Sequence, residues 1–573
     1  MSTAAVVALT GMLLVAVASA VIGTAHARLA RSTSDFLVAS RTVGPVANAG
    51  AISGEYLSAA SFLGVAGLIL RDGADALWYP VGFTAGYLGL LLFVAAPLRR
   101  SGAYTVPDFA EARLSSPALR GVCTVFVLVI GWLYVLPQLQ GAGLTVAMVT
   151  PLPSWSGVVA AGVLVTATVA LGGMRSVTFV QAFQYWLKLT ALLIPAIVVL
   201  AVFSTDDRGF DRAAPPRFAD PSTVRVDTDV VLTVTEPVTF RATGELDGRR
   251  VDGSVTWAPG EHTVRAGAEL AFAADAAVPV VAGAPLTNET WLTPLPDVHE
   301  YGLLATYSLI IATFLGTLGL PHVLVRFYTN PDGRTARRTA VVVLGLLGAF
   351  YVLVTLLGVL SRLYTPQLLV TGETDAAVLL LPSAVLGGGW AGILLGGLVA
   401  AGAWAAFLST ASGLIVSIAG VLSTDVLPGR LRDFRAAALV AGAVPLALAL
   451  GVTRLDFAET VALAFALTAS TFAPLLLLGI WWRGLTDRGA LAGMTVGGVL
   501  TTGAVAASLG GAGGEGLLGV LLHRPAVVSV PAAFLVMIVV SVLTRDRRPA
   551  DSDDILLRLH APDRLGLGRG PTY

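Results

Sequence analysis

The chain has 573 residues, of which 55% are hydrophobic and 13% charged, and its formal net charge at pH 7 is zero. A soluble globular domain carries about 25% charged residues, so this composition excludes one and indicates a protein that crosses the membrane many times. Zero net charge gives no indication of nucleic-acid binding. The single cysteine, Cys123, excludes an internal disulfide. The sequence contains no phosphate-binding loop and no cluster of metal ligands, so we do not expect an enzyme.

The apolar stretches predict about thirteen membrane-spanning helices, because about 20 apolar residues are needed to cross about 30 Å of hydrocarbon. In chain order they lie near residues 4–26, 44–70, 77–98, 119–149, 154–171, 178–203, 301–325, 339–361, 386–423, 436–452, 457–481, 489–509 and 526–543. The first has no basic residue ahead of it and is long enough to span, which favours a retained helix over a cleaved signal peptide.

The distribution of arginine predicts the orientation of these helices, because cytoplasmic connections carry an excess of basic residues. Under this helix count, most arginines of the connections and of the C-terminal tail fall on one side: Arg28, Arg31, Arg41, Arg99, Arg100, Arg113, Arg326, Arg334, Arg337, Arg338, Arg430, Arg432, Arg435, Arg483, Arg488, Arg545, Arg547 and Arg548. We therefore expect a multi-pass protein of the bacterial cytoplasmic membrane, with its N-terminus outside and its C-terminus in the cytoplasm.

About 95 residues between Ser204 and Glu300 are soluble in composition and fall on the outer side under the same count. Within them, apolar and polar residues alternate, and turn signals occur at Asp247-Gly248 and Pro259-Gly260. This pattern is typical of a small antiparallel β unit. Three interpretations stay open for the insertion: a solvated decoration, a docking site for a small membrane partner protein or ligand, and a lid over the substrate entrance.

The most informative stretch lies between residues 51 and 67, where a glycine, an acid and several hydroxyl groups interrupt an apolar span: Gly54, Glu55, Tyr56, Ser58 and Ser61. A charged residue near the bilayer centre costs about 2.5 to 3.5 kcal/mol on insertion scales, so an acid at this depth indicates function. Irregular backbone occurs at membrane depth only where it is buried in protein or lines a cavity. We therefore predict a broken helix with a binding site at the break, as in a transporter.

Two further stretches have the composition of a binding site. Between residues 403 and 425, the hydroxyls of Ser409 and Thr410 share a helical face with the carbonyl of Ala406. Such oxygens suit a small hard cation; the alternatives are hydrogen bonds within the same helix and contacts between helices. Between 316 and 326, two glycines and a proline predict a second interrupted helix. Four helices separate the two breaks, so the broken helices run in opposite directions, as an inverted repeat with a midplane site requires.

Six motifs follow one another along the membrane segments: SGEYLSAASFLG at 53–64, YTVPDFAEARL at 104–114, PQLQGAG at 137–143, GGMRSVTFVQ at 172–181, GTLGLPHVLVRFYT at 316–329 and ALAFALTASTFAPLLLLGIWWRGLTDRGA at 462–490. In content and order they resemble those of the sodium:solute symporter family, and within it the cation/acetate, or monocarboxylate, permease branch. The resemblance implies an all-α integral membrane protein with a LeuT-type five-plus-five inverted repeat. It also implies secondary active symport, by alternating access, of sodium and a small monocarboxylate of the acetate, propionate or pyruvate type into the cell.

On this template the chain divides into an extra N-terminal transmembrane helix at 1–27, a first repeat of five helices at 43–203, the extracytoplasmic β-rich insertion at 204–300, the first four helices of the second repeat at 301–452, its fifth helix at 453–482, two C-terminal transmembrane helices at 488–544 and a cytoplasmic tail at 545–573. The insertion is unlike the acetate permeases, so the resemblance says nothing about its role.

The resemblance also implies which residues bind the cargo. It assigns the sodium ion to oxygens of Gly54, Leu57, Ala406, Ser409 and Thr410. It assigns the small organic anion to the first broken helix, the third core helix and the second broken helix, through Tyr56, Ser58, Ser61, Tyr134, Gln138, Phe314 and Thr317. For Phe314, core packing is the alternative.

Two positions need separate weighing. Many relatives have a Thr-Asp pair where this chain has Val180-Gln181, and some use that acid for a second sodium ion, so we expect no second ion here. Three roles stay open for Glu55: it tunes ion binding, it carries a proton, or it accepts hydrogen bonds from backbone donors freed by the break. An anionic substrate 4 Å from this carboxylate would be repelled by about 4 kcal/mol at an effective dielectric constant of 20. A cation between them would offset that repulsion.

Three alternatives to sodium-coupled monocarboxylate uptake stay open. The same fold could carry proline, another amino acid or a sugar. Uptake of the monocarboxylate could be coupled to protons through Glu55. The chain could also be a sensor that uses the transporter scaffold to report a solute without transporting it.

Overall fold

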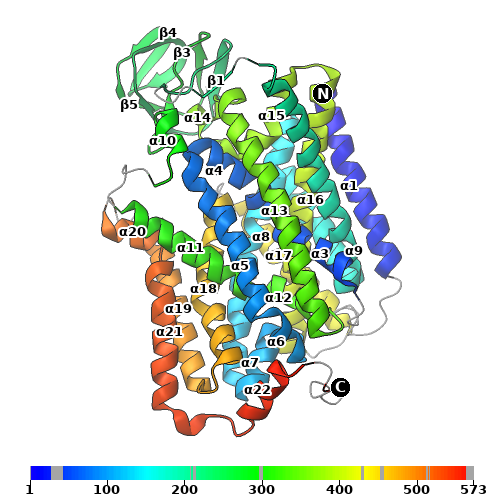
Figure 1. Cartoon of the computed structure of the whole chain (residues 1–573). Helices are drawn as coiled ribbons and strands as arrows, with labels where there is room; N and C mark the ends of the chain where they lie inside the picture. The colour runs from blue at the N-terminus through cyan, green and yellow to red at the C-terminus, as the bar shows by residue number, and fades with distance from the viewer. Residues whose placement is uncertain are drawn as a thin grey trace.

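The computed structural model describes residues 2–27, 43–206, 208–210, 214–295, 301–427, 431–451, 457–510, 514, 516–562 and 565. These residues form a tall bundle of helices with a small sheet at one end (Figure 1). The N-terminus lies at the end that carries the sheet, and the C-terminal segment lies at the opposite end.

The bundle is built from helices of very different lengths. In chain order they are α1 (Thr3–Ala27), α3 (Pro45–Tyr56), α4 (Val65–Asp72), α5 (Trp78–Phe93), α6 (Ala95–Arg100), α7 (Val106–Leu114), α8 (Pro117–Val149), α9 (Ser154–Phe203), α11 (Gly302–Gly319), α12 (Pro321–Tyr328), α13 (Gly333–Tyr364), α15 (Ala377–Leu386), α16 (Trp390–Val421), α17 (Leu431–Gly451), α18 (Phe457–Trp481), α19 (Asp487–Leu509), α20 (Leu517–His523), α21 (Ala526–Leu543) and α22 (Ser552–His560). The apolar stretches did not predict the short helices α7, α15, α20 and α22.

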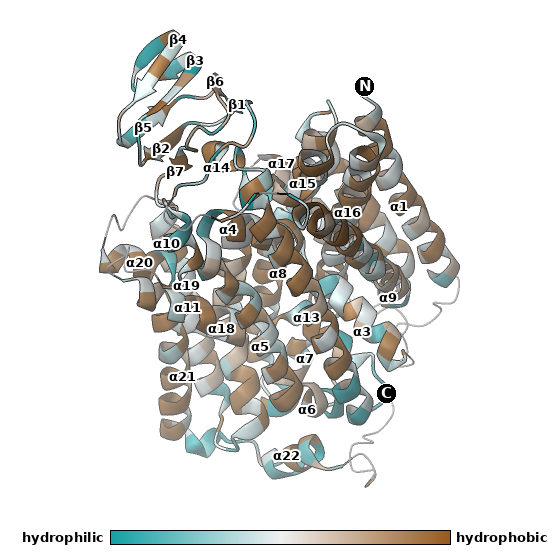
Figure 2. Ribbon diagram, turned by 45° about the horizontal axis from the view of Figure 1, so that its top comes forward, coloured by the Kyte–Doolittle hydropathy of each residue, from teal (hydrophilic) through white to brown (hydrophobic). Residues whose placement is uncertain are grey.

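The surface of the bundle is that of a membrane protein. Eleven helical segments within the described chain are long and apolar enough to cross a membrane. Figure 2 shows apolar residues along the sides of the bundle helices and polar residues on the sheet and on α22. Apolar sides flanked by polar ends match the hydrocarbon core and the two aqueous faces of a bilayer.

The longest helix, α9, contains a break at Gly173, whose backbone angles are not helical (φ 56°, ψ −157°). A straight helix of 50 residues would be about 75 Å long, more than twice the thickness of the hydrocarbon core. Thr168 and Ser176, on either side of the break, both lie beside Gly23 of α1. The chain therefore folds back at Gly173, and the predicted helices 154–171 and 178–203 are the two arms of α9.

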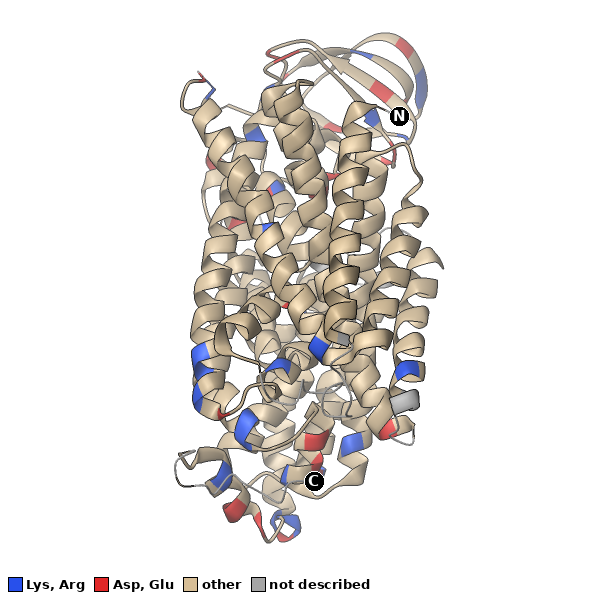
Figure 3. Ribbon diagram, turned by 90° about the vertical axis from the view of Figure 1, so that its right-hand side faces the viewer, with Lys and Arg blue, Asp and Glu red and all other residues tan. Residues whose placement is uncertain are grey.

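Charged residues gather at the ends of the molecule, and few lie in the middle of the bundle (Figure 3). Near α7, Arg120 forms ion pairs with Asp108, Glu111 and Asp425. Among the described residues, five charged side chains are buried: Glu55, Arg113, Lys188, Arg326 and Arg362. Burial of a charge is costly unless it is paired, so each of these needs a partner.

The segment predicted to form a β unit contains one sheet of seven strands. They are β1 (Ser222–Val226), β2 (Val230–Val234), β3 (Val238–Leu246), β4 (Arg249–Trp257), β5 (Gly260–Val264), β6 (Ala268–Phe272) and β7 (Val280–Val281), and a short helix, α10 (Asn288–Leu292), follows them. The order is β1-β6-β3-β5-β2-β7, with β4 paired to β3. The β3–β4 hairpin turns at Asp247 and Gly248, which both have positive φ (49° and 73°), as a tight hairpin turn of the I′ type requires.

Trp291 of α10 attaches this insertion to the helix that follows the first break. Its indole nitrogen donates to the backbone oxygens of Ile69 and Leu70, over 2.9 and 3.1 Å. The guanidinium of Arg362 lies 5.0 Å from the centre of the Trp291 ring. Gly73 has a φ of 65°, and a Cβ there would lie 1.9 Å from the Trp291 carbonyl oxygen, so only glycine allows this close approach.

We expect Trp291→Ala to weaken the attachment of the insertion and to destabilise the protein by about 3 to 5 kcal/mol, because it removes a buried aromatic side chain and both indole hydrogen bonds. The melting temperature of the detergent-solubilised protein measures the effect. Trp155→Ala is the matched control, since that side chain is 60% exposed. Equal melting temperatures for the two variants would show that Trp291 is not the attachment point.

Candidate substrate and cation site

The first predicted break lies between α3 and α4. Helix α3 ends at Tyr56, and Leu57 has non-helical backbone angles (φ −79°, ψ 90°). The helix resumes with a π-helical turn at Ala60–Gly64 that leads into α4. In the last turn of α3, a Cβ on Gly54 would lie 2.5 Å from the backbone oxygen of Gln181, so a glycine is needed for α3 to pack against α9 at this depth.

The second predicted break lies between α11 and α12. Helix α11 ends at Gly319, Leu320 has a ψ of 112°, and Pro321 starts α12, where the missing N–H of a proline is harmless. The two breaks face each other across a hydrogen bond of 2.8 Å between the Tyr56 hydroxyl and Thr317 Oγ1. Both interruptions predicted from the sequence are therefore present, and they lie side by side.

Three of the five oxygens that the resemblance assigns to sodium contact the ammonium group of Lys188 from the second arm of α9. Lys188 Nζ donates to the carbonyl oxygen of Gly54 at 2.6 Å, to that of Leu57 at 2.7 Å and to Ser409 Oγ at 3.0 Å. Lys188, Leu57 and Ser409 are all 0% exposed. The predicted cation-binding oxygens thus converge, and a side-chain cation lies at the point where they meet.

The other two predicted sodium ligands lie around this point without contacting Lys188. The Ala406 carbonyl accepts a hydrogen bond of 3.0 Å from Ser409 Oγ within α16. Thr410 Oγ1 donates to the backbone oxygen of Glu55 at 2.6 Å. Ser409 Oγ also donates to the Gly54 oxygen at 2.6 Å. The two neighbouring hydroxyls thus bond to two successive carbonyls and join α16 to the last turn of α3.

The Glu55 side chain forms a buried ion pair with Arg326 of α12. Arg326 Nε donates to Glu55 Oε2 at 2.6 Å, and the exposed fractions of the two side chains are 0% and 1%. The same guanidinium donates to Thr178 Oγ1 at 2.7 Å and to Gln181 Oε1. Counting Arg326 among the cytoplasmic connections was wrong: it is buried in the bundle, because α12 continues past the second break as a helix.

Gln181 and Gly413 complete the surroundings of this ion pair. Gln181 Nε2 donates to the backbone oxygen of Ser409 at 2.6 Å, so one amide connects the Glu55–Arg326 pair to the cation site. A Cβ on Gly413 would lie 2.1 Å from the Glu55 carboxylate, so this glycine of α16 provides the space for it. Gln181 stands where many relatives have an acid. Here it is a neutral link that donates to Ser409 and accepts from Arg326.

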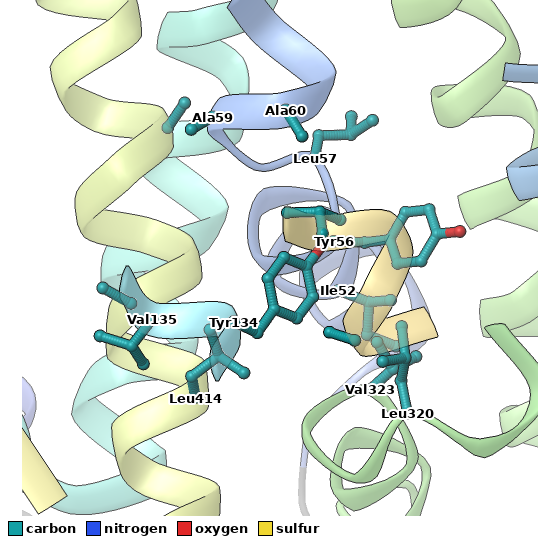
Figure 4. Close-up of a cluster of buried hydrophobic side chains, with 14 of the residues drawn as sticks. Ile52, Tyr56, Leu57, Ala59, Ala60, Tyr134, Val135, Leu320, Val323 and Leu414 are labelled. Carbon is teal, nitrogen blue, oxygen red and sulfur yellow. The ribbon is translucent and has the colours of Figure 1, made fainter. Parts of the chain in front are cut away.

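Most of the predicted substrate residues are buried around the two breaks. The Tyr134 ring of α8 points toward the end of α3, and the Tyr56 ring extends from α3 away from Tyr134 (Figure 4); both side chains are buried. Gln138 Oε1 accepts a hydrogen bond of 2.9 Å from the freed backbone nitrogen of Ala59, and Ser61 Oγ lies 3.1 Å from the Tyr351 hydroxyl. Ser58 and Thr317 are 0% exposed.

Phe314 differs from the other predicted substrate residues because it is only half-buried, and its ring packs against Gly89 of α5. Residues that the sequence did not single out line the space instead. Phe465 of α18 lies 6.0 Å from the Tyr134 ring, and Phe83 of α5 lies 6.2 Å from the Tyr56 ring. Nothing in their local sequence distinguishes them from ordinary apolar residues.

His322, in the first turn of α12, is buried beside the same space. Its ring lies 5.2 Å from that of Tyr134 in an edge-to-face arrangement. Within the described chain, neither ring nitrogen has a hydrogen-bond partner. A buried imidazole without a partner, at the N-terminal end of a half-helix, is an unused hydrogen-bonding group beside the breaks.

Interrupted helices that meet inside a bundle, with buried polar groups at the breaks, define a secondary transporter. Comparison with known proteins identifies the kind: the family model described as "Sodium:solute symporter family" matches residues 36–239 and 297–497, more than half of the chain. The chain therefore belongs to the sodium:solute symporter family. The family predicted from the sequence motifs is confirmed.

Two curated relatives cover nearly the whole chain. It is 29% identical over 540 residues to the "Uncharacterized symporter YwcA" of Bacillus subtilis, covering 91% of each protein. It is 27% identical over 570 residues to the "Monocarboxylic acid transporter" of Corynebacterium glutamicum, covering 94% of this chain and 92% of that one. The second relative agrees with the predicted resemblance to the monocarboxylate branch.

Two solved structures share the fold. A substrate-bound, outward-open Na⁺-coupled sialic acid symporter matches with a TM-score of 0.63 and 15% identity, over 94% of this chain and 97% of that one. The nucleobase-cation-symport-1 transporter Mhp1 in a closed conformation matches with a TM-score of 0.52 and 12% identity, over 91% and 98%. At these identities the likeness concerns the fold alone.

Proposed function

We propose that the protein is a secondary active symporter that carries a small monocarboxylate, of the acetate, propionate or pyruvate type, into the cell by alternating access. The similarity to the monocarboxylic acid transporter of C. glutamicum over nearly the full length of both chains carries this proposal. The resemblance implies sodium as the coupling ion. Because three of its five predicted ligands contact Lys188 in this chain, the proposal is limited to coupling with a cation.

The charges around the breaks support an anionic substrate. Lys188 and Arg326 carry two positive charges into the bundle, and Glu55 carries one negative charge. With all three groups ionised, their charges sum to one positive charge beside the first break. Electrostatic interactions are strong in a dry interior, so this excess charge favours an anion and opposes a cationic solute.

The aromatic side chains around the breaks favour a small substrate. The Phe465 ring lies 6.5 Å from the Tyr56 ring and 6.0 Å from the Tyr134 ring, measured between ring centres, so bulky side chains crowd the region between the breaks. An acetate or pyruvate ion needs one or two hydrogen bonds and a small apolar surface for its methyl group. His322, whose ring nitrogens have no partner among the described residues, supplies a hydrogen bond, and the aromatic rings supply the apolar surface.

The membrane arrangement is part of the same proposal. Two of the eleven apolar segments each contain two crossings. The segment Ala60–Phe93 holds the end of the interrupted helix α3–α4 and the separate helix α5, and α9 holds two arms. The number of crossings is then thirteen. We propose the five-plus-five inverted repeat for residues 43–203 and 301–482, with the N-terminus and the insertion outside and the C-terminus in the cytoplasm. This places Trp291 at the outer end of α4.

Uptake of labelled acetate into proteoliposomes tests the proposed function. We expect saturable uptake that unlabelled propionate and pyruvate inhibit, and that proline, other amino acids and sugars do not. Inhibition by one of the latter solutes, with no effect of propionate or pyruvate, would reject the monocarboxylate assignment while leaving the transporter fold intact.

We expect Tyr56→Phe to raise the KM for the monocarboxylate about three- to tenfold, because it removes the hydrogen bond between the breaks, worth about 0.5 to 1.5 kcal/mol. Tyr87→Phe is the matched control. Tyr87 lies 5.2 Å from the Tyr56 ring, but its hydroxyl has no hydrogen-bond partner among the described residues. Similar KM values for both variants would show that the Tyr56–Thr317 bond is not involved.

A further inference from the structure

The position of Lys188 disagrees with a sodium ion at the site that the resemblance predicts. An ammonium group has three N–H donors and no acceptor. Lys188 Nζ has three oxygen neighbours at hydrogen-bond distance, from Gly54, Leu57 and Ser409. Donors and acceptors are matched one to one, and a sodium ion bound to the same oxygens would have to occupy the same space.

We propose that the ammonium group of Lys188 is a built-in cation that replaces sodium at this site, so that the site binds no sodium and uptake does not require it. The inference deepens the proposed function, on which its uptake measurements rest. A sodium gradient then cannot drive transport through binding at this site. The coupling cation binds to another group.

The surroundings of Lys188 explain how the charge can stay there. It is the single lysine of the chain and is fully buried. A buried charge persists only when it is paired or fully hydrogen-bonded. The three oxygens provide the hydrogen bonds. Glu55, the residue after Gly54 in α3, pairs with Arg326 of α12, and Gln181 connects this ion pair to the backbone of Ser409.

The same contacts suggest what the lysine does. Its ammonium connects the two backbone oxygens at the α3 break to Ser409 of α16, which joins the end of the broken helix to the long helices behind it. A bound cation would make the same connection. In this chain the connection is covalent at one end, through α9, and does not depend on ion concentration.

Acetate uptake and ²²Na⁺ binding by the full-length protein test the proposal. We expect wild-type uptake rates in sodium and in choline medium of equal ionic strength to agree within about twofold, and no saturable ²²Na⁺ binding. We expect Lys188→Ala to lower sodium-free uptake at least about tenfold. The variant should also gain ²²Na⁺ binding, because the oxygens of Gly54, Leu57 and Ser409 are then free to bind an ion. Ser412→Ala is the matched control in α16, since among the described residues its hydroxyl bonds only to the Leu408 carbonyl of its own helix.

Several results would overturn the proposal: saturable ²²Na⁺ binding to the wild type that Ser409→Ala removes, a rise of more than about tenfold in wild-type uptake with sodium, or undiminished sodium-free uptake by Lys188→Ala. If Lys188→Ala does not fold, the measurement of ²²Na⁺ binding to the wild type still tests whether the site binds sodium. The binding measurement needs no monocarboxylate, so an error in the proposed substrate would abolish acetate uptake in every medium and leave the binding result unaffected.

Discussion

Arg326→Met is expected to abolish uptake and to destabilise the protein by about 3 to 5 kcal/mol, the cost of breaking a buried ion pair by removing one partner. The carboxylate of Glu55 would lose its 2.6 Å contact with Arg326 Nε and would stay buried without a counter-charge. Thr178 and Gln181 would lose a hydrogen-bond donor at the same time. Because Gln181 also holds the backbone of Ser409, the damage reaches the cation site.

Glu55→Gln combined with Arg326→Met separates charge from packing. Replacing both partners of a buried ion pair by neutral groups of similar size is often close to neutral for stability. We therefore expect the double variant to regain most of the melting temperature that Arg326→Met loses. Its uptake shows whether Glu55 has a role beyond pairing with Arg326: full recovery of uptake would exclude Glu55 as an obligatory proton carrier.

Arg71→Met is the matched control for the ion pair. Arg71 pairs with the adjacent Asp72, and both side chains are 30% exposed. A partly exposed pair of this kind contributes about 0 to 1 kcal/mol to stability. We therefore expect Arg71→Met to shift the melting temperature only slightly. Equal shifts for Arg71→Met and Arg326→Met would contradict the structural role assigned to the buried pair.

The sequence predicted the two breaks because their signals are local, and the family resemblance implied the oxygens that meet at the first one. A glycine, an acid and hydroxyl groups in an apolar span depart visibly from their surroundings, and so do two glycines before Pro321. Backbone oxygens are freed wherever a helix is interrupted, whatever lies opposite. The residues of the site that depend on a single helix could therefore be found without a structure.

Lys188 and Arg326 could not be assigned in the same way, because their partners lie 131 or more positions away in the chain. Arg326 follows an apolar span and precedes basic residues, so a count of charges places it in a connection. A lysine in an apolar stretch equally fits a side chain that reaches toward the membrane surface. The one signal available was that the chain's only lysine and Glu55 both fall within predicted spans.

The insertion shows the same division between local and distant information. Alternating residues and the Asp247-Gly248 turn predicted strands, and the structure has a hairpin at that turn. The strand order, in which β6 lies between β1 and β3, depends on contacts between segments far apart in the chain. The attachment through Trp291 could not be predicted either, since an isolated tryptophan in a polar segment shows no partner.

Gly54→Ala is expected to reduce uptake at least about tenfold while leaving the protein folded in the membrane. The added Cβ would lie 2.5 Å from the Gln181 backbone oxygen, closer than van der Waals contact allows, so α3 and α9 would have to separate. Overpacking of this kind costs about 1 to 3 kcal/mol. Lys188 and the oxygens of Gly54 and Leu57 lie on these two helices, so the separation lengthens their contacts.

Gly348→Ala in α13 is the control, because a Cβ at that position meets no atom within 4 Å. An alanine there is expected to stabilise the helix by about 0.5 to 1 kcal/mol, so the two substitutions should shift the melting temperature in opposite directions. Wild-type uptake by Gly54→Ala would mean that α3 can move away from α9 at no cost to transport. The contacts of the Gly54 and Leu57 oxygens with Lys188 would then not be needed for the cycle, and the break would act only by giving the helix a hinge.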